Sequence, residues 1–487
     1  MSLKQEGLKG SKWTSLSTIS VSVIQISQLI LLSRILSPTD FGIMGIIQIV
    51  LGFAMIYSDA GISNILLSKE NPSKEFISTL FIGNIFFGFL VTLVLLALNP
   101  LIVSFYHEES LRMPLFLISF VFLIIPLGQQ FQVLFQKNLQ FNVLSKIEIS
   151  SNFIGFILSL SLAVIHPNVL ALVFGQITIY TMKAGLLFFI GSKKWRHGLY
   201  FSFNEFKQSF SFGAFQMGEK TVHFFSTNLD KMIIGKLFGT EVLGLYNLAY
   251  QIIILPVLKI NPVITNIAVS LFSRVSNNKE KLKKGYLSIL GYISFINFPI
   301  YFGLALVSPL IVPLFLGEKW SESIELIQVL SIMGAIRSLI SPNTTLTVSH
   351  GRADIGFTWT IVTMIILIPS ITVGAFIGGA VAISWALVIS QVILFFINYG
   401  LIIKRFISLT LYEYIRVFFK PLMISFVMFL IGYGLLEYTL PINYFGLFFL
   451  MSTCILFYFV FNSILNKEVF MDFYSLVKKN KRIKLNT

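Results

Sequence analysis

The segment Leu32-Ser-Arg-Ile-Leu-Ser-Pro-Thr-Asp-Phe-Gly42 occurs again in altered form as Ile234-Gly-Lys-Leu-Phe-Gly-Thr-Glu-Val-Leu-Gly244. The residue numbers of the second copy are higher by 202, and this offset aligns Gly42 with Gly244. Two further matches follow in the same order: residues 62–65 with 264–267 and, after a seven-residue insertion, residues 100–106 with 309–315. Three ordered matches indicate an internal repeat, which predicts a molecule built from two similar halves.

The composition around these segments is that of a membrane protein. Of the 487 residues, 55% are hydrophobic and 12% are charged, and the mean hydropathy is +0.84. Soluble domains carry about 25% charged residues, and one globular core cannot bury this much apolar surface. These values exclude a soluble enzyme, a disordered chain and a nucleic-acid binder. The single cysteine, Cys454, excludes a disulfide framework.

The hydropathy pattern predicts fourteen membrane-spanning helices, since about 20 apolar residues cross a bilayer. They cover residues 13–36, 41–67, 78–105, 113–136, 147–165, 169–191, 210–237, 243–272, 286–315, 323–349, 355–376, 378–403, 417–436 and 444–465. Six spans separate the partners of the repeat, so both halves have the same orientation. We therefore predict an all-α polytopic membrane protein. Two six-helix lobes, residues 1–200 and 201–405, are related by a parallel repeat, and residues 406–487 add two helices and a basic tail.

The net charge of +15 is unevenly distributed. With a cytoplasmic N-terminus, 27 of the 36 Lys and Arg residues lie on the cytoplasmic side, 4 lie outside and 5 lie within spans. This bias follows the positive-inside rule. It predicts that both termini are cytoplasmic, and only the cations within spans bear on the substrate.

The seventh span carries a polar face. Lys220, His223, Thr227 and Lys231 follow steps of 3, 4 and 4 residues, which places them on one side of a helix. Its repeat partner, the first span, has an uncharged polar face that includes Gln25. Ionisable groups at bilayer depth cost about 2.5–3.5 kcal/mol each on insertion scales, so they mark cavities or pairs. We predict a central cavity between the lobes, of the kind found in secondary transporters.

A cationic cavity favours an anionic substrate, and Arg and Lys both bind phosphate. The predicted substrate-binding residues are Lys220, Lys231, Lys259, Arg337, Gln25 and Asn266. The predicted ion- or proton-coupling residues are Asp59, Glu219, His223 and Asp230. No catalytic residue and no metal site is predicted, because the five histidines show no ligand spacing.

Several of these side chains have a purely structural alternative. Asp230 and Lys231 could lie at the outer end of the seventh span and extend to the membrane–water interface. Lys183 in the sixth span could also extend to an interface. Glu219 and Lys220 could form an ion pair with each other. His223 could be a packing residue, and the glutamines of the fourth span could join helices to one another. The repeat itself could belong to a duplicated scaffold without transport.

Three stretches resemble Wzx-type polysaccharide flippases of the multidrug/oligosaccharidyl-lipid/polysaccharide exporter superfamily. They are the segment 32–42, Asp59-Ala-Gly-Ile-Ser-Asn64, and Leu134-Phe-Gln-Lys-Asn-Leu-Gln-Phe141. The resemblance implies a flippase in the bacterial plasma membrane that moves an undecaprenyl-diphosphate-linked oligosaccharide from the inner to the outer leaflet by alternating access. The product would be O-antigen, capsule, exopolysaccharide or a teichuronic-acid type polymer. It implies as partners this lipid-linked sugar, the bilayer, and the pathway's polymerase and glycosyltransferases, with H⁺ or Na⁺ for coupling and no cofactor.

Other functions remain open from the sequence. A multidrug or cation exporter of the same superfamily predicts a cavity dominated by acids, whereas basic residues are more numerous here. A peptidoglycan-precursor flippase predicts the same number of spans and a cationic cavity. From a different class, an integral membrane polysaccharide polymerase or acyltransferase predicts a large outer loop or a carboxylate or His motif, and the short outer loops argue against it.

Overall fold

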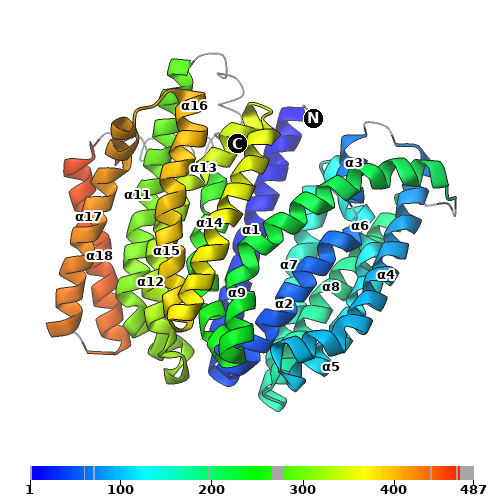
Figure 1. The fold of residues 1–487 in the computed structure, drawn as a ribbon, viewed down its shortest axis with the longest axis horizontal. Helices are drawn as coiled ribbons and strands as arrows, with labels where there is room; N and C mark the ends of the chain where they lie inside the picture. The colour runs from blue at the N-terminus through cyan, green and yellow to red at the C-terminus, as the bar shows by residue number, and fades with distance from the viewer. Residues whose placement is uncertain are drawn as a thin grey trace. The chain divides into compact units, whose positions relative to one another are not determined.

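The computed structural model describes residues 3–59, 61–69, 72–195, 198, 200–265, 279–438, 441–467 and 470–471. Every regular element in these ranges is a helix (Figure 1). The predicted all-α membrane fold is therefore confirmed. By packing, the chain divides into two compact units, unit 1 (residues 1–244) and unit 2 (residues 245–487).

Unit 1 consists of eight helices, a short 3₁₀ turn and the first part of a ninth helix. They are α1 (Leu3–Ile35), α2 (Pro38–Asp59), α3 (Ile62–Ser68), α4 (Lys74–Tyr106), η1 (Glu109–Leu111), α5 (Arg112–Ser119), α6 (Val121–Lys137), α7 (Phe141–Ile165), α8 (Val169–Ser192) and α9 (Phe203–Lys259). Figure 1 shows α4 to α8 side by side.

Unit 2 contains the end of α9 and the remaining elements. They are α11 (Lys279–Ile311), η2 (Val312–Leu316), η3 (Glu318–Trp320), α12 (Ser323–Ile340), α13 (Pro342–Ser349), α14 (Ala353–Ile377), α15 (Gly379–Asn398), η4 (Tyr399–Ile403), α16 (Lys404–Ile407), α17 (Leu411–Tyr438) and α18 (Tyr444–Leu465). Helices α17 and α18 pack on α11, where the Tyr458 hydroxyl donates to the Phe295 carbonyl at 2.7 Å. The predicted extra pair of helices is therefore part of unit 2.

The described residues contain 13 helices that are long and apolar enough to span a membrane, against fourteen predicted. The difference lies in α9, which joins two helices across a kink and contains the predicted span 210–237 and the first part of the predicted span 243–272. It is interrupted at Gly239, where φ is 84° and ψ is 177°. The expected loop between two spans is thus a single non-helical residue, which glycine adopts without a Cβ clash. The count of fourteen stays a prediction.

The opening segment builds the start of α2 in the way its residue types indicate. The Ser37 hydroxyl donates to Asp40 Oδ2 at 2.6 Å, and the Asp40 amide donates back to Ser37 Oγ at 3.2 Å. This reciprocal pair is a capping box. Pro38 occupies the first helical position, where its missing N–H costs nothing.

The two aligned glycines make matching close contacts within unit 1. A Cβ added at Gly42 would lie 1.7 Å from the Thr240 carbonyl oxygen, and one added at Gly244 would lie 1.8 Å from the Pro38 carbonyl oxygen. Pro38 and Thr240 are themselves aligned by the repeat. Each copy therefore touches the other through the same two positions, as two-fold-related segments do. This reciprocity supports the predicted repeat.

Small residues let neighbouring helices of unit 1 approach closely. A Cβ at Gly128 of α6 would lie 2.6 Å from Ala184 Cα of α8, and one at Gly155 of α7 would lie 2.8 Å from the Gly175 carbonyl oxygen of α8. Close backbone approach is a main source of helix association where lipid removes the hydrophobic driving force. These crossings hold α6, α7 and α8 together around the sites described next.

Candidate functional site

The polar face of α9 lines a cavity of about 480 Å³ in unit 1. Lys220, His223 and Thr227 all line it, so their predicted common face is confirmed. The other lining residues are Gln216, Glu219 and Phe224 of α9 and Gly52 and Ile56 of α2. We call this space the α2–α9 pocket. Whether these residues bind substrate stays a prediction.

Asp59, at the end of α2, is the anionic partner of this face. Its Oδ2 lies 3.7 Å from Lys220 Nζ, and the side chains are 14% and 43% exposed. Its Oδ1 accepts hydrogen bonds from Ser63 Oγ at 2.5 Å and from Gln129 Nε2 at 2.6 Å. The carboxylate is thus held by α3, α6 and α9 together. Two residues earlier, the Tyr57 hydroxyl lies 3.0 Å from Thr221 Oγ1.

The structure corrects two of the structural alternatives in α9. Lys220 pairs with Asp59, so the alternative of an ion pair between the neighbours Glu219 and Lys220 is wrong. Asp230 is 4% exposed and therefore does not extend to the membrane surface. Lys231 is half-buried, and Glu219 and His223 are exposed.

Lys183 also has a partner that the sequence did not indicate. Its Nζ lies 2.7 Å from Glu148 Oε2, which joins α8 to α7. The alternative that Lys183 reaches for the membrane surface is wrong. Glu148 is not among the predicted site residues, because it lies in the first turn of its predicted span, where an acidic residue is common. The step that brings it to Lys183 is the packing of α7 on α8.

The cations of unit 2 lie near the end of α9 and on α12. Arg337 is half-buried, and its Nη1 donates to the Tyr250 hydroxyl at 3.0 Å. Lys259 is half-buried at the last turn of α9. The neighbouring Asn261 is buried and donates to Ser341 Oγ at 2.7 Å. Asn266 lies outside the described residues.

Gln25 is exposed on α1. On the same helix, the Thr18 hydroxyl donates to the Thr14 carbonyl at 2.9 Å, and the Ser22 hydroxyl donates to the Thr18 carbonyl at 2.7 Å. Side-chain hydroxyls that bond their own helix backbone need no cavity water. Much of the polar face predicted for the first span is therefore satisfied within α1, which leaves Gln25 as its candidate ligand.

A second polar cavity, of about 320 Å³, lies inside unit 1 between α2, α3, α6 and α8. We call it the glutamine pocket, because Gln129, Gln132 and Gln136 line it from one face of α6. Ser58, Tyr180 and Lys183 line its other walls. From the sequence, the glutamines of the fourth span fit a polar cavity or, alternatively, a role as links between helices. That role fits Gln130, whose Nε2 donates to the Ile77 carbonyl at 2.6 Å.

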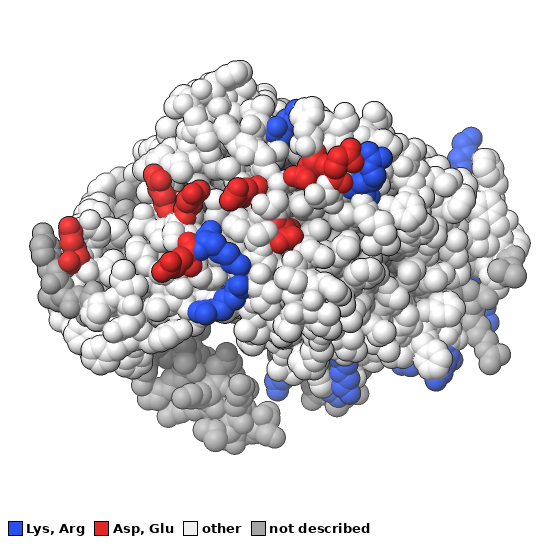
Figure 2. Space-filling view, turned by 90° about the horizontal axis from the view of Figure 1, so that it is seen from below, with Lys and Arg blue, Asp and Glu red and all other residues white. Residues whose placement is uncertain are grey.

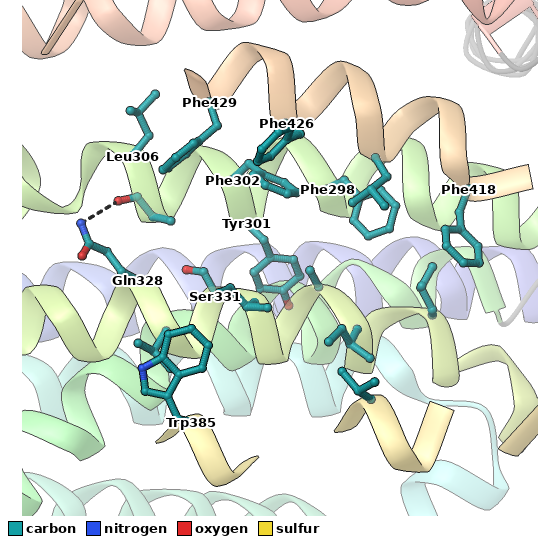
Figure 3. A pocket seen from close by; sticks show the side chains of 18 of the residues that line it. Phe298, Tyr301, Phe302, Leu306, Gln328, Ser331, Trp385, Phe418, Phe426 and Phe429 are labelled. Carbon is teal, nitrogen blue, oxygen red and sulfur yellow. Dashed lines mark hydrogen bonds between the residues drawn. The ribbon is translucent and has the colours of Figure 1, made fainter. Parts of the chain in front are cut away.

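A third cavity, of about 760 Å³, is an apolar groove in unit 2 between α11, α12, α15 and α17 (Figure 3). Phe298, Phe302, Phe418, Phe426 and Phe429 project toward it from α11 and α17, and Trp385 projects from α15. Figure 3 shows that the Gln328 amide, at one end, donates to the Ala305 carbonyl at 3.5 Å. We call it the phenylalanine groove. Its walls suit a hydrocarbon chain.

The polar groups of these sites are suited to binding a ligand. Among the described residues, no group of three His, Cys, Asp or Glu side chains could hold a metal ion. The polar sites offer ammonium and guanidinium groups, amides and hydroxyls at membrane depth. Such groups can receive an anionic or hydroxyl-rich ligand within the bilayer.

Comparison with known proteins places the chain in a family. A family model described as "Polysaccharide biosynthesis protein" matches residues 31–325. The chain is 35% identical over 433 residues to the teichuronic acid biosynthesis protein TuaB of Bacillus subtilis (strain 168), with 89% of each chain covered. It is 29% identical over 435 residues to the lipopolysaccharide biosynthesis protein WzxC of Escherichia coli (strain K12), covering 89% of this chain and 88% of WzxC.

Among solved structures, the fold is similar to that of the lipid II flippase MurJ in an inward closed conformation. The TM-score is 0.78 at 15% sequence identity, and the match covers 95% of this chain and 99% of MurJ. At this identity the similarity concerns the fold alone.

Proposed function

Because the chain belongs to the polysaccharide biosynthesis protein family, in which the sequence places it among the Wzx-type flippases, we propose that it moves a polyprenyl-diphosphate-linked oligosaccharide across the membrane. It is a transporter and not an enzyme. The observation that carries this proposal is the combination of half-buried lysines at membrane depth with an apolar groove of about 760 Å³. A lipid-linked sugar presents an anionic diphosphate and a long hydrocarbon tail, which are complementary to these two features.

The diphosphate is the group that Lys220 is placed to bind. Lys220 is 43% exposed beside the α2–α9 pocket, and the 3.7 Å separation from Asp59 is long for a hydrogen-bonded ion pair. Asp59 itself is satisfied by Ser63 and Gln129. A phosphate oxygen can therefore bind Lys220 in place of Asp59, because the Asp59 carboxylate keeps its hydrogen bonds from Ser63 and Gln129. Within unit 2, Arg337 and Lys259 are separate candidate ligands for an anionic group.

The phenylalanine groove is the part that fits the polyprenyl tail. Exposed aromatic side chains such as Phe426 and Phe396 border it, at 43% and 50% exposure. An isoprenoid chain packs against such walls through dispersion contacts. If the tail stays in the groove of unit 2 while the head group moves, the hydrocarbon does not pass through the polar sites.

The driving force we propose is the membrane potential together with H⁺ or Na⁺ coupling. An inside-negative potential moves an anion outward with about 2.3 kcal/mol per charge per 100 mV. The residues proposed to carry the coupling charge are Asp59, Glu219, His223 and Asp230, all of which lie in unit 1. Imposing a potential, a pH gradient or a Na⁺ gradient one at a time on reconstituted vesicles separates these sources.

The chain is a multi-pass bacterial membrane protein, and we propose that it lies in the plasma membrane with both termini in the cytoplasm. Helix ends opposite the predicted cytoplasmic side carry acids, among them Glu108 and Glu109 in unit 1 and Glu318, Glu322 and Glu325 in unit 2. Figure 2 shows Lys and Arg side chains beside several of the carboxylates on the surface seen from below. The proposed orientation therefore rests on the distribution of Lys and Arg along the sequence, as in the positive-inside rule. The pathway's polymerase and glycosyltransferases are the proposed partners.

The proposal is tested by reconstituting the protein in vesicles that contain a labelled undecaprenyl-diphosphate-linked oligosaccharide. We expect protein-dependent appearance of the sugar in the opposite leaflet. The variants Lys220→Ala and Arg337→Ala should each slow this transfer by about tenfold, the effect of losing one charge-assisted hydrogen bond, with unchanged membrane insertion. Vesicles loaded with peptidoglycan precursor test the alternative cargo.

Absence of transfer for every polyprenyl-linked sugar, with a correctly inserted protein, would refute the flippase. Lys194→Ala is the matched control, because Lys194 is an exposed lysine at the end of α8 that bonds Gln140 at 2.7 Å. We expect it to leave the transfer rate unchanged.

A further inference from the structure

The glutamine pocket contains polar atoms whose hydrogen bonds are incomplete. Ser58 is 2% exposed, and its Oγ has no hydrogen-bond partner among the described residues. The same holds for the buried Oε1 of Gln129. An unpaired polar atom at membrane depth costs free energy unless a ligand or water completes its bonds. Both residues line the same cavity, where a turn of either side chain would present its polar atom to a ligand.

Side-chain amides are repeated along one wall of the pocket. Gln129, Gln132 and Gln136 lie three and four residues apart on α6, and all three line the pocket. Each glutamine amide offers an acceptor oxygen and two N–H donors. Sugar hydroxyls are likewise both donors and acceptors. The ring of Tyr180 on α8 adds a flat apolar surface that suits the C–H face of a sugar ring.

The size of the pocket also favours a sugar. One water takes up roughly 30 Å³ of liquid volume, so the 320 Å³ cavity is equivalent to about ten waters. Ligand pockets for small organic molecules begin at about 300 Å³. A single monosaccharide ring with its hydroxyl groups fills a space of this order, whereas a dehydrated monovalent ion needs a much tighter shell.

The charges around the pocket indicate a neutral ligand. Lys183, at its wall, is neutralised by Glu148 at 2.7 Å. Asp59, beside it, receives donors from Ser63 and Gln129 on Oδ1 and faces the Lys220 ammonium with Oδ2. A cation would have to displace these donors before reaching the carboxylate. The remaining free bonding capacity is that of amides and hydroxyls.

The pocket also has a firm frame. Gly128, which lines it, brings α6 so close to α8 that an added Cβ would lie 2.6 Å from Ala184 Cα. The separation of the glutamine wall from the Tyr180 wall is therefore set by backbone contact. A pre-formed pocket loses little conformational entropy when it binds a ligand.

We propose that the glutamine pocket binds one neutral monosaccharide unit of the transported glycan, separately from the site that holds the diphosphate. This inference rests on the proposed function and names a sugar subsite for it. The diphosphate engages Lys220 in the α2–α9 pocket, while the amides of α6 engage sugar hydroxyls. The pocket thereby distinguishes a sugar-bearing lipid from bare undecaprenyl diphosphate.

The test uses thiol labelling of the full chain in vesicles. Cys454 is the only native cysteine, so Cys454→Ser provides a cysteine-free background for Gln132→Cys or Gln136→Cys. The reagent is a charged methanethiosulfonate. The probes are the lipid-linked oligosaccharide fraction of the source cells, undecaprenyl diphosphate without sugar, and Na⁺ alone. Ser68→Cys, exposed at the end of α3 and outside the pocket, is the control position.

We expect the sugar-bearing lipid to slow labelling at positions 132 and 136 by about fivefold, because the bound sugar shields the thiol from the reagent. This factor corresponds to the contribution of about one hydrogen bond to binding. Undecaprenyl diphosphate and Na⁺ should leave these rates unchanged, and position 68 should respond to none of the probes. Equal protection by undecaprenyl diphosphate overturns the sugar subsite, and protection by Na⁺ alone makes the pocket a cation site instead.

A functional variant completes the test. Gln132→Leu should slow transfer of the sugar-bearing lipid about fivefold while undecaprenyl diphosphate still slows labelling of a cysteine placed in the α2–α9 pocket. If the wild-type vesicles transfer lipid-linked sugar but show no protection at 132 or 136, the subsite is wrong and the flippase stands. Sugar-specific protection without any transfer keeps the subsite and refutes the flippase.

Discussion

Asp59 accepts hydrogen bonds from two helices and faces a lysine on a third. Its Oδ1 receives Ser63 Oγ and Gln129 Nε2, while Lys220 lies 3.7 Å from Oδ2. At the scale of single residues, the proposed function predicts that Asp59 and the substrate phosphate compete for Lys220. We expect Lys220 to leave Asp59 when phosphate binds and to return when phosphate leaves.

The variant Asp59→Asn tests this competition. The amide oxygen can still accept a hydrogen bond, but the negative charge is lost, so Lys220 stays available to phosphate. A partly exposed ion pair contributes up to about 1 kcal/mol, so affinity for the lipid-linked oligosaccharide should rise about two- to fivefold. Slower release should lower the transfer rate. Binding titration and the vesicle assay measure the two effects.

The matched control is Asp354→Asn. Asp354 forms a pair with Arg352 at 2.6 Å, at the exposed start of α14. Its loss should change neither affinity nor transfer. An Asp59→Asn protein with unchanged affinity would show that Lys220 does not alternate between the two anions.

At the scale of elements, the contact between the two repeated segments depends on the absence of a Cβ. The start of α2 and the helix that follows Gly239 touch through Gly42 and Thr240, and through Gly244 and Pro38. Both contacts are between backbone atoms, so a side chain cannot turn aside to make room. The two glycines are therefore structural requirements of this crossing.

Replacing Gly42 by Ala should destabilise unit 1, because the new Cβ would overlap the Thr240 carbonyl at 1.7 Å. Overpacking typically costs about 1–3 kcal/mol. Gly185→Ala in α8 is the control, since nothing lies within 4 Å of its Cβ position. Alanine favours a helix there by about 0.8–1 kcal/mol, so the two variants should shift the melting temperature in detergent in opposite directions. Equal shifts of the melting temperature in the two variants would contradict the close contact between Gly42 and Thr240.

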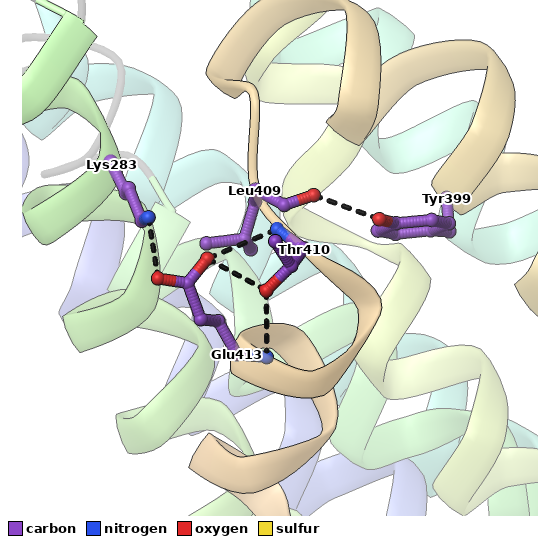
Figure 4. Close-up of polar contacts among 5 residues, drawn as sticks. All are labelled: Lys283, Tyr399, Leu409, Thr410 and Glu413. Carbon is purple, nitrogen blue, oxygen red and sulfur yellow. Dashed lines mark hydrogen bonds and ion pairs between the residues drawn. The ribbon is translucent and has the colours of Figure 1, made fainter.

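The start of α17 is held by a second capping box (Figure 4). The Thr410 hydroxyl bonds Glu413 Oε2 at 2.9 Å, and the Glu413 amide donates back to Thr410 Oγ1 at 3.3 Å. Lys283 of α11 donates to the other carboxylate oxygen at 2.6 Å. Just before this box, the Tyr399 hydroxyl donates to the Leu409 carbonyl at 2.8 Å. These bonds fix where α17 begins and attach it to α11.

Thr410→Ala should lower the free energy of unfolding by about 1 kcal/mol, the usual cost of losing such a cap. For a unit of this size the melting temperature should fall by about 2–4 °C. Thr358→Ala on α14 is the control, because its hydroxyl bonds only the Asp354 carbonyl of its own helix. If the Thr410→Ala protein is as stable as this control, the capping box does not stabilise the start of α17.

At the scale of the whole molecule, orientation follows from charge. The basic residues of the sequence concentrate at the helix ends predicted to be cytoplasmic. In a Cys454→Ser background, Ser110→Cys should react with a membrane-impermeant thiol reagent in intact cells. Ser68→Cys should react only after permeabilisation. Both positions are exposed in unit 1, and the reverse pattern would invert the orientation.

The sequence predicted the fold well because the relevant signals are local. Hydropathy alone located the long helices, but it did not show that a single residue, Gly239, separates two of the predicted spans. It also did not show that the predicted spans 41–67, 113–136 and 323–349 are each divided into two helices. The periodicity of Lys220, His223 and Thr227 placed them on one face, which the α2–α9 pocket confirms. Periodicity could not identify the partner of that face, because it says nothing about which helix lies opposite.

The sequence by itself determined that this is an all-helical membrane protein of the polysaccharide flippase type, with its cations biased to one side. These properties are sums over residues or patterns within one helix. Only the tertiary structure decided that Lys220 pairs with Asp59 and Lys183 with Glu148, and that three glutamines face a cavity. Such pairings depend on which helices pack together and how each is rotated, and that is settled by close backbone crossings between distant segments.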